Sequence, residues 1–141
     1  MKWTLPAILA LTVVGCSSNG GDAAKNGTPA AGGTEKESYT IGMSQCNLGE
    51  PYRVQMNKDI EAAAKEHPEL QVVFKDAQND ALKQRSHIEE FVQDKVDLLI
   101  VSPKEAQPLT EPVAKAIDAG IPVIVLDRAV LGDKYTCFIG A

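Results

Sequence analysis

Blocks of apolar residues with two different spacings follow one another along the chain. Short apolar runs lie at 39–43, 70–74, 96–101, 121–126 and 135–139. The segments between the first four runs place apolar side chains three or four positions apart, the period of an amphipathic helix. The pattern therefore predicts five strands, with helices connecting the first four.

Start and stop signals bound each predicted helix. Pro51 suits the first turn of a helix, because its missing N–H would be unpaired there, and Pro68 ends this helix near His67. Asp80 is the expected N-cap of the second helix, and Gly120 is the expected terminator of the third. The apolar faces comprise Met56, Ile60, Ala63 and Ala64 in the first helix, Ile88, Phe91 and Val92 in the second, and Leu109, Val113, Ala116 and Ile117 in the third.

Unbroken apolar strands joined through helices indicate a parallel sheet covered on both faces. Right-handed crossovers make this sheet doubly wound, so the predicted fold class is α/β and Rossmann-like. A fifth strand begins at Tyr135 and the sequence stops at Ala141, with no helix after that strand. We therefore expect the domain at 39–141 to be incomplete, with an apolar edge that is marginally stable or prone to aggregation.

The first 38 residues have a different composition. The apolar run at 5–14 is shorter than the roughly 20 residues that a membrane-spanning helix needs, and it is typical of an export signal. Residues 13–16 resemble the bacterial lipobox, which predicts a lipoprotein signal peptide at 1–16 with Cys16 lipidated; the alternative is an ordinary signal in which this cysteine is incidental. Residues 17–38 lack large apolar side chains and predict a flexible linker, a tether if Cys16 is lipidated or otherwise loose terminal residues without a role. The expected location is the periplasmic or extracytoplasmic face of the cell envelope, with a lipid anchor in the membrane.

Composition and missing motifs exclude several functions. The formal net charge of −5 argues against a nucleic-acid binder that relies on a basic field, and no helix-turn-helix precedes Tyr39. The sequence has no G-x-S-x-G motif, Gly-rich phosphate loop or visible nucleophile–base pair, so we expect neither an enzyme nor a cofactor. His67 sits before Pro68 at a helix end, and His87 lies on the second helix with no cysteine or carboxylate at ligand spacing, so no metal site is expected.

Polar side chains gather where the predicted strands end. Ligands of open parallel sheets bind beyond the carboxyl ends of the strands. Asp127 can accept two hydroxyl protons and Arg128 donates a planar fork, a pair that suits a polyhydroxylated ligand; the alternative is a structural ion pair. Tyr52 and Arg53 could add a ring face and a second fork. The full set of candidate ligand-binding residues is Ser44, Gln45, Asn47, Tyr52, Arg53, Asp76, Gln78, Ser102, Asp127 and Arg128.

Four segments also match a known family: 39–45, Tyr52-Arg53, 96–103 and 119–128. Through them the region at 39–141 resembles the sugar-binding proteins of bacterial ABC importers, with the type I periplasmic-binding fold of ribose- and galactofuranose-binding members. The resemblance implies that Asp127 and Arg128 grip ring hydroxyls. It also implies that Ser44, Gln45 and Asn47 line the first loop and that Tyr52 or Arg53 reaches the sugar. Gln45, Glu50 and Arg53 favour the galactofuranose type, since the paired aromatics of the ribose-type loop are absent.

Two functions follow from this resemblance. The first is a lipid-tethered solute-binding protein that closes two lobes over a sugar and presents it to an ABC permease, as a monomer when complete. The second is a sensor that presents a sugar or signal molecule to a membrane receptor kinase. Because the family requires a second lobe, we expect this sequence to hold part of the N-terminal lobe and about half of a binding site. The family's strand order would separate Cys46 from Cys137 by two strands, so both are expected to be free thiols.

Overall fold

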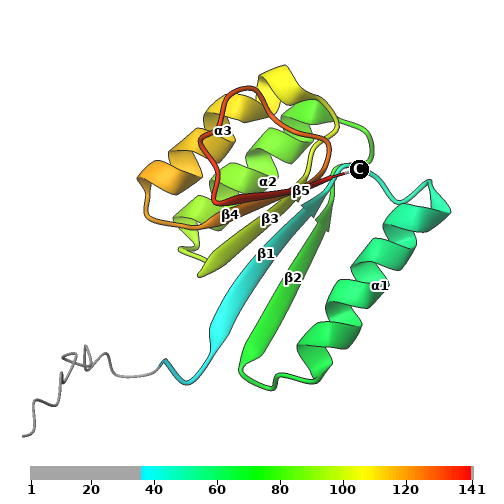
Figure 1. The fold of residues 1–141 in the computed structure, drawn as a ribbon, viewed down its shortest axis with the longest axis vertical. Helices are drawn as coiled ribbons and strands as arrows, with labels where there is room; N and C mark the ends of the chain where they lie inside the picture. The colour runs from blue at the N-terminus through cyan, green and yellow to red at the C-terminus, as the bar shows by residue number, and fades with distance from the viewer. Residues whose placement is uncertain (1–35, 141) are drawn as a thin grey trace, which may run out of the picture. The chain divides into compact units, whose positions relative to one another are not determined.

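The computed structural model describes residues 36–140. The predicted signal peptide, Cys16 and the linker up to residue 35 lie outside the described residues. Eight elements follow one another (Figure 1). They are β1 (Tyr39–Gln45), α1 (Pro51–Lys65), β2 (Leu70–Asp76), α2 (Ala81–Gln93), β3 (Leu98–Ser102), α3 (Ala106–Asp118), β4 (Val123–Asp127) and β5 (Cys137–Gly140).

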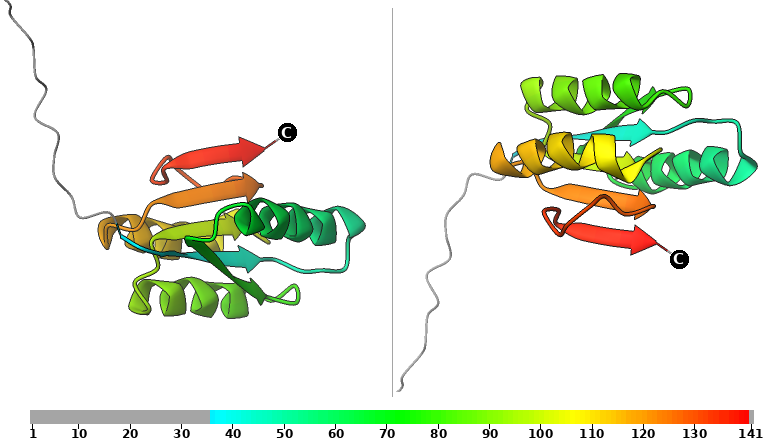
Figure 2. Two further views of the ribbon diagram at one scale, coloured as in Figure 1. Left: turned by 90° about the horizontal axis from the view of Figure 1, so that it is seen from below. Right: turned by 90° about the horizontal axis from the view of Figure 1, so that it is seen from above.

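The strands form one parallel sheet in the order β2-β1-β3-β4-β5. All of them run toward the same edge, which Figure 2 shows from two sides. Each step from β1 to β4 passes through a helix, as the sequence pattern predicted. The α/β fold with a parallel sheet is therefore confirmed.

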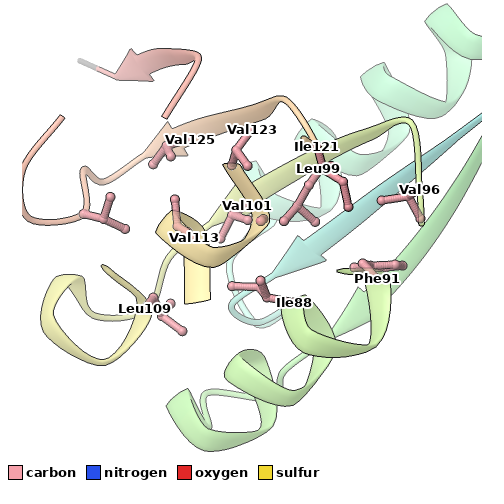
Figure 3. Packing of buried hydrophobic residues seen from close by; sticks show 12 residues of the cluster. Ile88, Phe91, Val96, Leu99, Val101, Leu109, Val113, Ile121, Val123 and Val125 are labelled. Atoms are coloured by element: carbon pink, nitrogen blue, oxygen red, sulfur yellow. The ribbon is translucent and has the colours of Figure 1, made fainter. Parts of the chain in front are cut away.

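The helices bury the two faces of the sheet unequally. A large apolar core lies between the sheet and the helices α2 and α3, and it includes Ile88, Phe91, Leu109 and Val113 (Figure 3). The opposite face carries a smaller buried cluster of Ile41, Met43 and Ile100, against which Met56 and Ile60 of α1 pack while staying partly exposed. On this helix, Ala63 of the predicted apolar face is exposed and Ala64 half-buried.

Backbone hydrogen bonds explain where the strands begin. Val96 and Ile121 are buried apolar residues that the sequence pattern assigned to strands. Their N–H groups instead donate to Phe91 and Ala116 of the preceding helices, at 3.2 and 3.0 Å. β3 and β4 therefore begin two residues later than predicted, because these apolar residues are buried by the turn that leaves the helix.

The predicted helix boundaries agree with the structure. Asp80 accepts hydrogen bonds from the N–H groups of Leu82 and Lys83, at 2.8 and 3.1 Å, and so caps α2. Gly120 follows α3 with a φ of 83°, in the left-handed region that glycine adopts without strain. The sequence therefore predicted both the N-cap of α2 and the residue that terminates α3.

Cys46 and Cys137 are both free thiols, as predicted. Cys46 follows β1 and Cys137 begins β5, and the strands β3 and β4 lie between them. Among the helices described at 36–140, none has both the length and the apolar character needed to cross a membrane.

Candidate functional site

The carboxyl ends of the strands bring polar residues from distant parts of the sequence to one edge. Gln45, the last residue of β1, pairs in register with Asp76 of β2 on one side and with Ser102 of β3 on the other. Asp127 ends β4 at the same edge. Because the strands are parallel, the polar residues that end β1 to β4 all lie at this edge.

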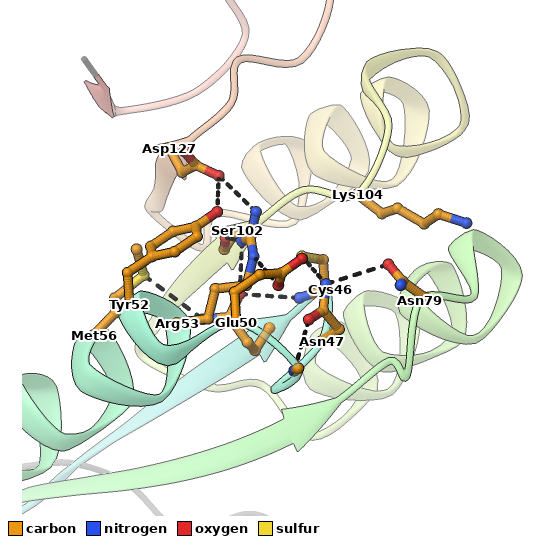
Figure 4. A network of polar contacts seen from close by, with 12 residues as sticks. Cys46, Asn47, Glu50, Tyr52, Arg53, Met56, Asn79, Ser102, Lys104 and Asp127 are labelled. Carbon is orange, nitrogen blue, oxygen red and sulfur yellow. Dashed lines mark hydrogen bonds and ion pairs between the residues drawn. The ribbon is translucent and has the colours of Figure 1, made fainter.

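The Arg53 guanidinium connects the ends of β1, β3 and β4 (Figure 4). It lies in the first turn of α1, and the residue is only 1% exposed. Its Nη1 donates to Gln45 Oε1 at 3.1 Å and to Ser102 Oγ at 2.8 Å. Its Nη2 donates to Asp127 Oδ2 at 2.8 Å, and its Nε donates to Glu50 at 3.1 Å. Most of the guanidinium's five N–H groups are therefore engaged by the protein, and the side chain acts as a fixed cationic centre.

Tyr52 lies beside this centre and is half exposed. Its ring centroid is 4.8 Å from the Arg53 Cζ, a cation–π distance, and its hydroxyl donates to Asp127 Oδ2 at 3.3 Å. Desolvation, together with the Asp127 carboxylate, raises the pKa of the Tyr52 phenol, so the hydroxyl stays protonated and can donate at neutral pH. The ring offers an exposed apolar face at the edge of the site.

Asp127 adopts an unusual backbone conformation. Its φ is 66°, in the left-handed region where Asn and Asp are tolerated better than most other residues. Tyr52 and Arg53 both donate to its Oδ2, and the side chain remains 30% exposed. Strained backbone conformations cluster at ligand-binding sites, where the surrounding contacts hold them. The carboxylate is thus fixed in direction while its other oxygen can accept hydrogen bonds.

Arg128 presents the most exposed charge of the site. Its side chain is 56% exposed, and its Nε lies 3.9 Å from Asp127 Oδ2. Its Nη1 donates to the carbonyl oxygen of Lys104, in the loop after β3, at 2.9 Å. This one backbone contact holds the guanidinium while leaving most of its N–H groups available to a ligand.

Asn47 closes the loop between β1 and α1. Its Oδ1 accepts a hydrogen bond from the N–H of Gly49 at 2.8 Å, and its Nδ2 donates to Asn79 at 3.2 Å and to the Cys46 thiol at 3.4 Å. Burial raises the pKa of the Cys46 thiol, so the sulfur is a neutral acceptor at this position. Asn47 therefore fixes the loop that carries it.

Four of the candidate residues make no direct side-chain contact with the Arg53 cluster: Asn47, whose partners lie in its own loop and at Asn79, and also Ser44, Asp76 and Gln78. Asp76 accepts from the N–H of Gln78 at 2.8 Å, and Gln78 Oε1 accepts from Lys83 at 2.6 Å, so both serve the loop before α2. Ser44 precedes Gln45 on β1, and alternate strand residues point to opposite faces of a sheet. The Ser44 hydroxyl is fully buried and has no hydrogen-bond partner among the described residues 36–140.

Gln84 is a polar residue of this region that the sequence pattern did not single out. It lies on α2, fully buried, and its side chain contacts the ends of β1 and β3. Its signal was available, because Gln84 precedes Ile88 and Phe91 by four and seven positions and so shares their buried helix face. A polar side chain on such a face needs hydrogen-bond partners.

The described residues 36–140 contain no group of three or more His, Cys, Asp or Glu side chains that could hold a metal ion. Their polar residues at the carboxyl edge are instead amides, hydroxyls, guanidinium groups and carboxylates. Such groups recognise hydroxyl groups by hydrogen bonding.

Comparison with known proteins gives one consistent result. Residues 41–141 match the family model described as a periplasmic binding protein domain. The chain is 36% identical over 144 residues to the ribose import binding protein RbsB of Bacillus subtilis strain 168, covering 100% of this chain and 46% of that protein.

Solved structures give the same picture. The fructose-binding periplasmic domain of a hybrid two-component system is 41% identical, with a TM-score of 0.70, over 73% of this chain and 34% of the other. A solute-binding protein of an ABC transporter from Bacillus halodurans C-125, solved with myo-inositol, is 33% identical with a TM-score of 0.69, over 74% of this chain and 37% of the other. The chain thus spans less than half the length of these proteins.

Proposed function

The chain belongs to the periplasmic binding protein domain family, and on this premise we propose that its protein binds a sugar as the solute-binding component of an ABC importer. The family membership rests on the match over residues 41–141. The ligand class is supported by the names of relatives that bind ribose, fructose or myo-inositol. These ligands share several adjacent hydroxyl groups.

The arrangement around Asp127 is the observation that carries the proposal. A carboxylate held by Arg53 and Tyr52 accepts hydroxyl protons through its remaining lone pairs, while Arg128 donates to hydroxyl oxygens. The exposed ring of Tyr52 can lie against the apolar face of a sugar ring. Affinity then comes from paired hydrogen bonds and ring contact, and no catalytic group is required.

The signal peptide and linker predicted within the first 38 residues extend the proposal to the cell envelope. Export followed by lipidation at Cys16 would anchor the domain through the linker at 17–38, near a membrane permease. The measurement is mass spectrometry of the protein purified from membranes. A diacylglycerol adduct on Cys16 that is absent from the Cys16→Ala variant supports the anchor, and an unmodified Cys16 refutes it.

The second candidate is a sensor that passes the ligand signal to a membrane receptor kinase. It is favoured by one observation, the 41% identity to the fructose-binding domain of a hybrid two-component system. The genes beside the coding sequence distinguish the two. Permease and ATPase genes support the importer, and a receptor kinase gene without them supports the sensor.

Calorimetric titration of the full-length protein with D-ribose, D-fructose and myo-inositol tests the binding function. We expect saturable binding of at least one of them. Binding should be lost in Asp127→Asn, which keeps side-chain size and tolerates the left-handed backbone, and in Arg128→Ala. Asp118→Asn is the matched control, because Asp118 ends α3 and pairs with Lys134 at the surface. Unchanged sugar affinity in both site variants would refute the assignment of these two residues.

A further inference from the structure

Gln84 is buried behind the site and uses both ends of its carboxamide. Its Nε2 donates to the carbonyl oxygen of Ser44 at 3.3 Å and to that of Ser102 at 2.9 Å. Its Oε1 accepts a hydrogen bond from the N–H of Lys104 at 2.9 Å. The residue is 0% exposed, so it cannot itself touch a ligand in solution. One side chain of α2 therefore joins the ends of β1 and β3 and the loop that follows β3.

The two residues of β3 and the loop after it that Gln84 contacts, Ser102 and Lys104, also accept hydrogen bonds from two arginines. Ser102 accepts from Gln84 through its carbonyl oxygen and from Arg53 through its hydroxyl. Lys104 donates its N–H to Gln84 and accepts from Arg128 through its carbonyl oxygen. The position of Gln84 is thus linked to both guanidinium groups, each through one intervening residue.

We propose that Gln84 is a positioning residue for the sugar site, which fixes the end of β3 and the loop after it so that Arg128 points toward the ligand and Arg53 keeps its hold on Asp127. This proposal rests on the proposed function and adds a residue that acts through others. Buried amides seldom remain unpaired, so the carboxamide has little freedom to adopt another arrangement. Without it, the Lys104 N–H loses its partner and the carbonyl that anchors Arg128 is free to shift.

Two substitutions test the role. Gln84→Met keeps nearly the same volume and removes all three hydrogen bonds. Gln84→Asn keeps the carboxamide but is shorter by one methylene, so it cannot reach the three partners together. Ile88→Ala is the matched control, because Ile88 is also fully buried on the same face of α2 but belongs to the apolar core. All three should lower thermal stability.

The readouts are the dissociation constant of the sugar that binds the wild-type protein and the hydrogen exchange of the Lys104 amide. Both Gln84 variants should raise the dissociation constant by about 10-fold, as removal of an outer supporting contact does at other sites. The Lys104 amide should exchange slowly in the wild type and in Ile88→Ala, and faster in the Gln84 variants. Ile88→Ala should bind within about twofold of the wild type, since the site and its supporting contacts remain.

Each outcome decides between the two proposals. If the wild type binds D-ribose, D-fructose or myo-inositol but folded Gln84→Met and Gln84→Asn bind equally well, the positioning role is wrong and the proposed function stands. A wild-type Lys104 amide that exchanges as fast as an unprotected amide overturns the positioning role even if neither variant folds. If the wild type binds none of the three sugars, the proposed function fails first.

Discussion

Replacement of Arg53 by methionine tests the centre of the site. Arg53→Met removes the guanidinium but keeps an unbranched side chain at a position that is 1% exposed. The residues that accept hydrogen bonds from Arg53 differ in whether they keep another donor. Gln45 Oε1 still accepts from the N–H of Cys46 at 3.1 Å, and the 30% exposed Asp127 still accepts from Tyr52 and can accept from water.

The largest loss of stability in Arg53→Met comes from Ser102. Its hydroxyl oxygen accepts from Arg53 at 2.8 Å, and the residue is 0% exposed, so no water replaces the lost donor. Leaving one buried polar group unpaired costs about 1–3 kcal/mol. The charge-assisted bonds to Asp127 and Glu50 are lost as well, while the desolvation of a buried cation is relieved. Together these effects lower the free energy of unfolding by about 2–3 kcal/mol.

Urea denaturation followed by circular dichroism measures this loss, and calorimetry measures the sugar affinity. We expect Arg53→Met to unfold at lower urea and to bind sugar at least about 10-fold more weakly, because the Asp127 carboxylate is no longer held. Arg85→Met is the matched control. Arg85 of α2 pairs at the surface with Glu89 of the same helix and with Glu111 of α3, so this variant should unfold near the wild-type midpoint. Wild-type stability and affinity in Arg53→Met would show that the Arg53 guanidinium does not hold the site together.

Two further predictions concern the packing of α2 on the sheet. In Gly42→Ala the added Cβ would lie 2.7 Å from atoms of the Phe91 ring, so the variant should lose about 1–3 kcal/mol of stability in urea denaturation, and Phe91→Leu in the same chain should recover part of it. Full retention of stability in Gly42→Ala would show that the ring moves freely. Burial, aided by Lys75, lowers the pKa of His87 below its ordinary 6.5. The unfolded chain therefore binds a proton that the folded chain excludes. The free energy of unfolding should fall as the pH drops through 6.5. Urea denaturation at several pH values should show a smaller loss of stability in His87→Gln. Replacement of the exposed His67 by glutamine is the control and should leave the loss of stability as in the wild type. An unaltered pH dependence in His87→Gln contradicts the prediction.

The fold was largely predictable because its signals are local. The period of the apolar residues, Pro51, the Asp80 cap and Gly120 each act within a few residues, and they gave the order and type of the elements. The errors fell at the residues where β3 and β4 begin. Apolar burial marks the core but does not distinguish a residue paired in the sheet from one bonded back to a helix, as Val96 is.

The site was predictable in position but not in detail. Strand ends alone located Gln45, Ser102 and Asp127 at one edge. The alternation of side chains along β1 is a local rule that separates Ser44 from its neighbour Gln45, and the sequence-based candidate set did not apply it. The engagement of Arg53 by residues far apart in the sequence depends on tertiary packing, which no local pattern encodes.

Amide chemical shifts, mapped as D-ribose, D-fructose or myo-inositol is added to the isotopically labelled full-length protein, test most directly whether the carboxyl edge of the sheet binds sugar. We expect saturable changes at this edge, at residues 45–47, 102–104 and 127–128, with little change at the opposite edge around Val96 and Gly120. Shifts confined to that opposite edge, or none with any of the three ligands, would show that the carboxyl edge is not a sugar site.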